Sequence, residues 1–125
     1  MPDQRPVYLN LVKIHLPVTG VVSLAHRVSG VLLFLFIPFA VYLLDSSIES
    51  AQSFERVQQL LQQPLMLLLQ IVLFWSLAHH FFAGIRFILI DAEIGIEKHQ
   101  ARIGSWLVLL AEALTVLLII FMVMS

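Results

Sequence analysis

The segment that decides the fold of this chain reads LAHHFFAGIR and covers residues 77–86. It places two imidazoles, His79 and His80, and the guanidinium of Arg86 in a stretch that is otherwise apolar enough to span a bilayer. Ionisable side chains are costly inside a membrane, so they usually mark a functional site. A histidine followed one turn later by a small residue, here Gly84, also offers an imidazole ligand and room for the flat ring of a haem. The segment therefore predicts a membrane helix that carries a site.

The composition of the whole chain favours a membrane protein. Of its 125 residues, 60% are hydrophobic and only 12% are charged, whereas soluble domains are roughly half apolar and about a quarter charged. The formal net charge of −1 gives no sign of a nucleic-acid partner. Because the chain has no cysteine, it cannot supply a disulfide, an iron–sulfur cluster or a covalently attached haem. Residues 1–6 have neither the apolar core of a signal peptide nor the Arg- and Ser-rich amphipathic character of a mitochondrial transit peptide, which favours a bacterial inner-membrane protein.

Hydropathy and proline positions divide the chain into six segments of a single membrane domain over residues 1–125. In order, these are an N-terminal arm at 1–20, a first span at 21–44, an outer loop at 45–63, a second span at 64–90, an inner loop at 91–102 and a third span at 103–125. The apolar stretches are long enough to cross a bilayer. We expect a short helix over 53–63 and a kink at Pro38, which membrane helices tolerate. The predicted fold is an all-α membrane protein with three transmembrane helices.

The positive charges lie almost entirely on one side of this arrangement. With a cytoplasmic N-terminus, the outer side carries only Arg56. The inner side carries six basic residues, which are Arg5, Lys13, Arg27, Arg86, Lys98 and Arg102. Since Lys and Arg accumulate on the cytoplasmic side of membrane proteins, we predict a cytoplasmic N-terminus and a periplasmic C-terminus.

Polar residues in the first span share one helical face. Ser23, His26, Arg27 and Gly30 follow the spacing i, i+3, i+4 and i+7. A hydroxyl, an imidazole and a fixed cation suit a quinone carbonyl or a haem propionate, and glycine permits close approach of a neighbouring helix. Alternatively, the arginine reaches the lipid headgroups and its polar neighbours are incidental. The spacing alone leaves both interpretations open.

The second span offers two candidate histidines. His80 shares a face with Gly84, whereas His79 shares another face with Arg86. The spacing favours His80 over His79 as a haem ligand, but both could instead hydrogen-bond across helices as polar packing groups. In the third span Glu112 stands alone. Protonation, pairing with a neighbour and membership of a proton path all remain open, and such a group is more often a neutral hydrogen-bonding group between helices, so we assign it no role.

Two motifs extend this interpretation beyond spacing. The first comprises Arg5-Pro6-Val7, Leu11, Val18, Ser23 and His26-Arg27-Val28-Ser29-Gly30. The second comprises His80, Gly84-Ile85-Arg86-Phe87 and Asp91. With three spans in 125 residues, the chain resembles the cytochrome b subunits of succinate dehydrogenase, which are small membrane anchors of respiratory complex II. It departs from their pattern at Ile90, where an aromatic residue or Met is usual, and at Glu93, where a small residue is usual.

The resemblance implies roles for individual residues. It implies that His80 is an axial ligand of a haem b iron, with the second axial histidine supplied by the other small anchor subunit. His26 and Arg27 match positions close to the haem propionates, and Gly84 makes room beside the ring. Ser23 and Arg27 match residues that line the ubiquinone site.

The function implied by the resemblance is that of a membrane-anchor and electron-transfer subunit of succinate dehydrogenase, inactive by itself. The expected partners are a flavoprotein subunit with FAD, an iron–sulfur subunit with its clusters, the second small anchor and membrane lipid. Ser23 and Arg27 would stabilise the negative charge that develops on a quinone carbonyl during reduction. Two alternatives are a quinol:fumarate reductase anchor, in which the same architecture runs in reverse, and a structural anchor that holds no haem.

Overall fold

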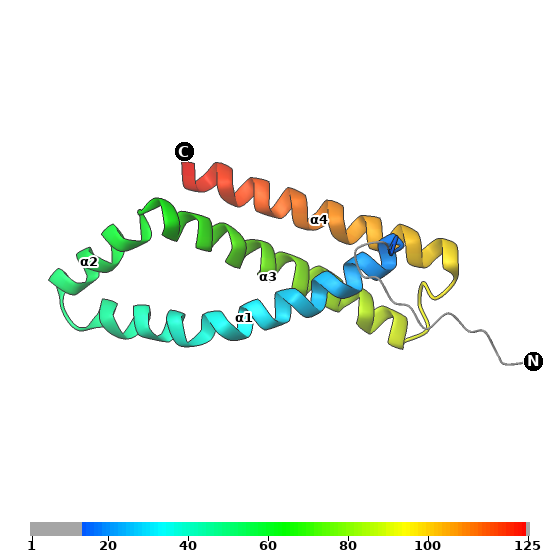
Figure 1. The fold of residues 1–125 in the computed structure, drawn as a ribbon, viewed down its shortest axis with the longest axis horizontal. Coiled ribbons are helices and arrows are strands. Elements are labelled where there is room, and N and C mark those ends of the chain that lie inside the picture. The colour runs from blue at the N-terminus through cyan, green and yellow to red at the C-terminus, as the bar shows by residue number, and fades with distance from the viewer. Residues whose placement is uncertain (1–13, 125) are drawn as a thin grey trace, which may run out of the picture.

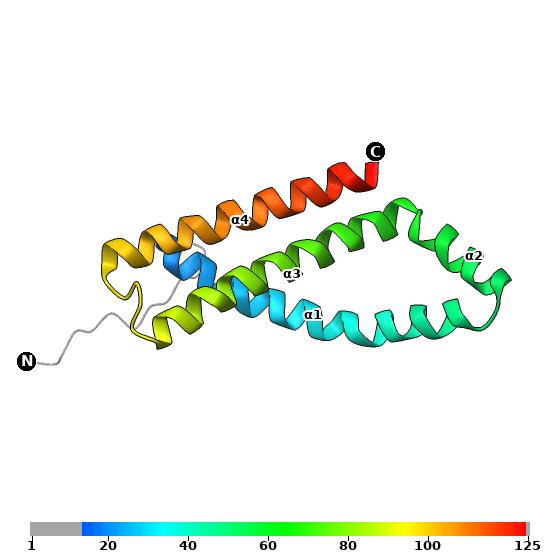
Figure 2. The same ribbon diagram turned by 180° about the vertical axis from the view of Figure 1, so that it is seen from behind.

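The computed structural model describes residues 14–124, and these residues form four α-helices (Figure 1). Their bounds are α1 Val18–Ile48, α2 Ala51–Leu61, α3 Pro64–Asp91 and α4 Lys98–Met124. The helices α1, α3 and α4 run along the long axis of the molecule, and the short helix α2 closes one end between α1 and α3 (Figures 1 and 2). Residues 1–13 of the predicted N-terminal arm lie outside the described residues.

Three of these helices are long and apolar enough to cross a membrane, as the sequence predicts. They cover Val18–Ile48, Pro64–Asp91 and Lys98–Met122. Even the shortest, with 25 residues, extends about 38 Å at 1.5 Å per residue, which exceeds the roughly 30 Å of a hydrocarbon core. The prediction of an all-helical chain with three membrane spans is therefore confirmed for the described residues, and α1 continues through Pro38 without a break.

The helices extend beyond the spans expected from hydropathy. Helix α1 begins at Val18 rather than at residue 21, and α4 begins at Lys98 rather than at residue 103. The first turn of α4 therefore lies within the predicted inner loop. Hydropathy marks where the apolar stretch ends, but a helix can continue into the interface, where basic side chains keep their charged ends in water.

The segment 45–63, interpreted from the sequence as an outer loop with a short helix over 53–63, is mostly helical. Helix α1 continues to Ile48, and α2 occupies Ala51–Leu61. A capping box starts α2, because the Ser53 backbone N–H donates to Ser50 Oγ at 3.1 Å and the Ser50 N–H donates to Ser53 Oγ at 2.9 Å. At the other end, Gln70 Nε2 donates to the Leu61 carbonyl at 2.8 Å, which joins α2 to α3.

Helix α3 ends in a Schellman turn. The Ile94 N–H donates to the Leu89 carbonyl at 2.8 Å, and the Glu93 N–H donates to the Ile90 carbonyl at 2.9 Å. Glu93 adopts φ 61°, a left-handed conformation that glycine adopts with little strain. The departure at Glu93 noted in the sequence therefore falls at a position where the backbone favours glycine.

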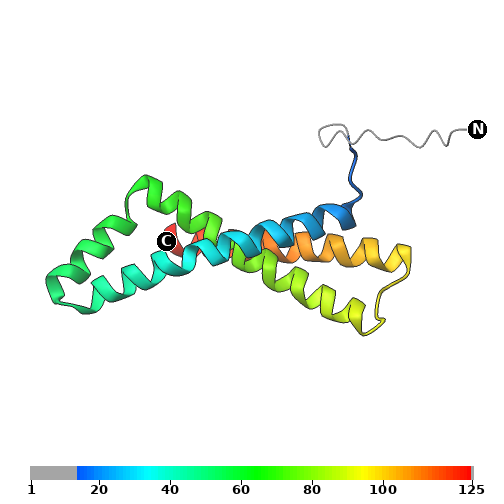
Figure 3. The same cartoon turned by 60° about the horizontal axis from the view of Figure 1, so that its bottom comes forward.

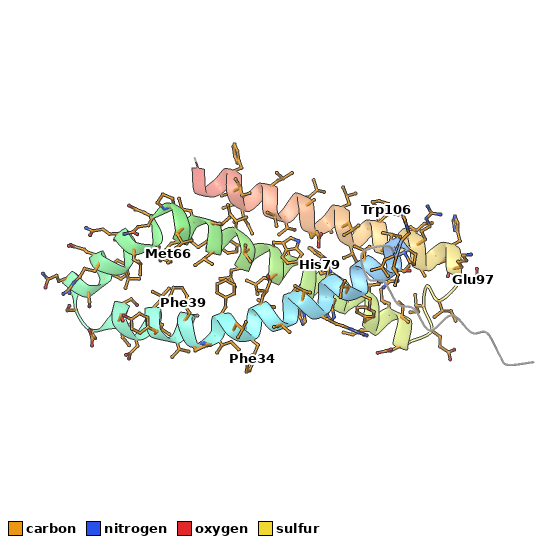
Figure 4. The ribbon with its side chains drawn as sticks, in the orientation of Figure 1. Phe34, Phe39, Met66, His79, Glu97 and Trp106 are labelled. Atoms are coloured by element: carbon orange, nitrogen blue, oxygen red, sulfur yellow. The ribbon has the colours of Figure 1, made fainter. Side chains whose placement is uncertain are left out.

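The helix interfaces are built from small and polar side chains, while most large apolar side chains face outward. Phe34 and Phe121 are each 71% exposed, and Figure 4 shows Phe34 pointing away from the bundle. The buried residues are Val22, Ser29, Ser76, Ala78, His79, Ala83, Arg86, Ser105, Val108 and Glu112. Lipid solvates large apolar groups, so membrane helices associate through close packing of small residues and through polar contacts. Helix α3 lies between α1 and α4, and α1 crosses it near the middle of the bundle (Figure 3).

Candidate functional site

The His80 imidazole lies where α3 crosses α1. Its Nδ1 is 3.3 Å from the His26 carbonyl oxygen and 3.3 Å from Ser29 Oγ. Ser29 Oγ donates its own proton to the same carbonyl at 2.8 Å. Because the carbonyl only accepts and the serine proton is already used, Nδ1 of the neutral His80 ring must carry the proton. The lone pair is then on Nε2, which forms no hydrogen bond with any residue of 14–124.

Gly30 and a second histidine pack closely against His80, and Gly84 lies beside that second histidine. The His26 ring stacks on the His80 ring with centroids 4.2 Å apart and planes 8° from parallel. A Cβ on Gly30 would stand 3.1 Å from His80 Cε1, and a Cβ on Gly84 would stand 3.7 Å from His26 Nε2. His26 Nε2 is buried and has no hydrogen-bond partner in the described part of the chain. The expected close approach of a neighbouring helix at Gly30 is therefore confirmed.

The adjacent histidine, His79, has a different environment. It is fully buried, with Nε2 3.2 Å from the Val22 carbonyl oxygen and Nδ1 hydrogen-bonded to Glu112 Oε2. The Trp75 ring lies over it at a centroid distance of 5.6 Å. Both nitrogens of His79 are therefore occupied, whereas His80 keeps Nε2 open. This difference separates the two histidines by geometry.

The pairing of His79 with Glu112 is the feature that sequence reasoning missed. The sequence indicated that each of these two residues could hydrogen-bond between helices, but it did not indicate that they are each other's partner. The available signal was that two neighbouring spans each carry an ionisable residue near the middle, since isolated charges at such depth require a partner.

Ser23 and Arg27 remain available on α1. Ser23 is half-buried and Arg27 is exposed. Neither side chain forms a hydrogen bond or ion pair within residues 14–124, so the hydroxyl and the guanidinium can donate to a ligand. His26 and Gly30, which were expected on the same face, pack instead at the α1–α3 contact with His80.

Arg86 is buried between α3 and α4. One terminal nitrogen donates to the Ala101 carbonyl at 3.3 Å, and the guanidinium lies 5.6 Å from the centre of the Phe87 ring. A Cβ on Gly104 would stand 3.5 Å from Arg86 Nε, so the absence of a side chain at Gly104 leaves room for the Arg86 side chain beside α4. The adjoining pocket of about 610 Å³ is lined by Pro17, Val18, Thr19, Arg86, Lys98, Ala101, Arg102 and Trp106. Three basic residues therefore meet at the end of the bundle where α4 begins.

Comparison with known proteins identifies the class that this fold and these residues define. Residues 1–119 match the family of succinate dehydrogenase/fumarate reductase transmembrane subunits, and the chain belongs to this family. It is also similar to the succinate dehydrogenase cytochrome b556 subunit of Coxiella burnetii (strain RSA 493 / Nine Mile phase I). The two are 34% identical over 119 residues, which cover 94% of this chain and 95% of the relative. The resemblance drawn from the two motifs is confirmed.

Proposed function

We propose that this chain is the membrane-anchor and electron-transfer subunit of a succinate dehydrogenase, which binds haem b together with a second anchor subunit and forms part of the ubiquinone-reduction site. The observation that carries the proposal is the state of His80. Its Nδ1 is held by the His26 carbonyl oxygen at 3.3 Å, and its Nε2 is open. Histidines that bind metals commonly donate their other ring N–H to a carbonyl, which fixes the tautomer and orients the ring.

The residues around His80 fit a haem. His80 Nε2 would bind the iron, and His26 Nε2, a buried atom without a partner in residues 14–124, would gain one from a polar group of the haem. Gly84 leaves space next to His26, and Arg27 supplies a fixed cation for a propionate. When bound, a haem supplies a one-electron carrier whose potential depends on its axial ligands and their hydrogen bonds. The name of the Coxiella relative, cytochrome b556 subunit, also supports this role.

Ser23 and Arg27 would form this chain's part of the quinone site. Their side chains lie one helical turn apart on α1, and both keep free donors within the described residues. Donors held at fixed positions in a medium of low dielectric constant stabilise the negative charge that a quinone carbonyl gains on reduction.

The proposed setting is the bacterial inner membrane, with a cytoplasmic N-terminus and a periplasmic C-terminus. The ends of α1 and α4 that meet near the α3–α4 connection (Figure 1) then lie on the cytoplasmic side, where Lys98 and Arg102 satisfy the positive-inside tendency. A flavoprotein subunit with FAD and an iron–sulfur subunit would dock there, and the second anchor subunit would pack in the membrane. Succinate oxidation itself belongs to the flavoprotein, so this chain alone is inactive.

A reduced-minus-oxidised absorption spectrum of the purified complex tests the haem proposal. We expect a b-type band in the wild-type complex, its loss in His80→Ala, and an unchanged band in the control His99→Ala, because His99 is exposed at the start of α4. A wild-type complex without a b-type band would favour the structural-anchor alternative. Retention of the band in His80→Ala would refute the assignment of the ligand.

Two activity measurements test the quinone proposal. Arg27→Leu should impair quinone reduction and leave succinate oxidation with a soluble acceptor intact, whereas the control Arg56→Leu, at an exposed cation of α2, should change neither. Equal quinone reduction in both variants would refute the role of Arg27. Because the matched family includes fumarate reductases, the ratio of succinate–quinone to quinol–fumarate turnover in the wild-type complex decides the physiological direction.

A further inference from the structure

The side chain of His79 joins all three membrane helices at one point. It extends from α3, bonds the Val22 carbonyl of α1 at 3.2 Å through Nε2, and contacts Glu112 of α4 through Nδ1. Figure 4 shows His79 inside the bundle. The surroundings are apolar, because Val22, Ala83 and Val108 form the buried core cluster at the same level. No other side chain within residues 14–124 is hydrogen-bonded to two other membrane helices.

The protonation of this pair follows from its partners. The Val22 carbonyl oxygen can only accept, so His79 Nε2 carries a proton. The contact between Nδ1 and the Glu112 carboxyl group must hold one more proton, since otherwise a lone pair would face a carboxylate. Wherever that proton lies along the contact, the pair carries no net charge, which makes its burial in a membrane bundle tolerable.

His79 and His80 together hold α3 against two successive turns of α1. His79 bonds the carbonyl of Val22 and His80 bonds the carbonyl of His26, at 3.2 and 3.3 Å. The two carbonyls are four residues apart and therefore lie on one face of α1. The two histidines point about 100° apart around the axis of α3. A contact that fixes the direction of His79 therefore also fixes the direction of His80.

The hydrogen bonds of His80 tolerate only a small rotation of α3 about its axis. An imidazole about 5.5 Å from the helix axis, at the outer radius of a helix with its side chains, moves by about 1 Å when the helix rotates by about 10°. The Nδ1 contacts of His80 are already 3.3 Å long, and a separation of about 3.6 Å is no longer a hydrogen bond. A rotation of a few degrees is therefore enough to release the His80 ring.

We propose that His79 and Glu112 are positioning residues for the haem ligand, holding the rotation of α3 so that the His80 imidazole keeps its orientation against α1. The inference rests on the proposed haem-binding role of His80 and adds two residues that would act through the orientation of His80 rather than as ligands. It gives Glu112 a role that its sequence neighbours do not indicate, and it explains why the histidine adjacent to His80 is buried with both nitrogens occupied.

The test uses the complete complex purified from membranes with three substitutions. Glu112→Leu removes the partner of His79, whereas Glu112→Gln keeps an amide that can hydrogen-bond Nδ1 in either direction. Ser76→Ala is the matched control, because Ser76 is fully buried on the same helix yet bonds only the Val72 carbonyl one turn away. The readouts are haem content, the electron paramagnetic resonance g values of the ferric haem and the thermal midpoint of the complex.

We expect Glu112→Leu to lower haem affinity about tenfold, the lower end of the range for residues that orient a metal ligand, and to shift the haem g values. Glu112→Gln should restore both, and Ser76→Ala should leave both unchanged. Where Glu112→Leu does not assemble, Glu112→Asp provides a graded test, because its shorter side chain weakens the contact and should give an intermediate shift.

The outcomes separate this inference from the proposed function. A wild-type complex without a b-type haem overturns both. A wild-type complex with haem, together with a Glu112→Leu or Glu112→Asp complex that keeps the wild-type g values and haem content, overturns the positioning role alone. A shift that also occurs in Ser76→Ala overturns it as well, since it would reflect general loosening of α3.

Discussion

Replacement of Gly30 by alanine should displace the His80 ring. A Cβ at position 30 would lie 3.1 Å from His80 Cε1, whereas ordinary contacts begin at 3.4 Å, so the ring must withdraw by at least about 0.3 Å. Its Nδ1 contacts are 3.3 Å long, and such a movement would stretch them to about 3.6 Å, beyond the range of a hydrogen bond. The ring would then lose the contacts that define its orientation.

Gly30→Ala should lower haem affinity more than it lowers the stability of the fold. Overpacking of a well-packed site costs about 1–3 kcal/mol, and the helix propensity of alanine returns about 1 kcal/mol relative to glycine. The free energy of unfolding should therefore fall by only about 0–2 kcal/mol. Haem affinity should fall more, by about 10- to 100-fold, because the contacts that orient a metal ligand are lost.

Pyridine haemochrome analysis of the purified complex, combined with thermal unfolding, measures both effects. Gly20→Ala is the matched control on the same helix, because a Cβ there would meet its nearest neighbours at 3.6 Å, an ordinary contact distance. We expect the control to keep its haem. If Gly30→Ala retains haem as well as Gly20→Ala does, close packing against Gly30 does not hold the His80 ring, and the reasoning is wrong.

Four further substitutions test how the helices end and join. Glu93→Gly should raise the free energy of unfolding by about 1 kcal/mol, because glycine adopts the left-handed conformation of this residue with less strain. Gly95→Ala should lower it by a similar amount, since Gly95 has φ 75° and a Cβ there would meet no neighbour. A lower thermal midpoint for Glu93→Gly or a higher one for Gly95→Ala would contradict this. Ser50→Ala should destabilise α2 by about 1 kcal/mol through loss of its N-cap, seen as faster hydrogen exchange in the first turn of α2 and nowhere in α3. Gln70→Leu should speed exchange near Leu61, since it removes the 2.8 Å bond that ties α2 to α3; unchanged exchange would show that packing alone holds this corner.

Much of the architecture follows from the sequence because it depends on local properties. Apolar stretches longer than a bilayer is thick predict three spans without reference to any contact. The two motifs, which include His80 and Gly84, indicate the family. The short helix expected over 53–63 is also present, but it starts at Ala51 because a capping box joins Ser50 and Ser53, a local signal that hydropathy does not register.

The arrangement of the site depended on the tertiary structure. Helical periodicity states which residues share a face of one helix, but it does not state how that face is rotated toward a neighbour. The partners of His79 lie 33 and 57 residues away along the chain, and His80 meets the His26 carbonyl across 54 residues. The sequence by itself therefore determined a membrane anchor with two adjacent histidines in its second span. Only the packing of α3 between α1 and α4 decided that His79 is enclosed with Glu112 and that His80 keeps an open nitrogen, because contacts between distant segments set the rotation of each helix.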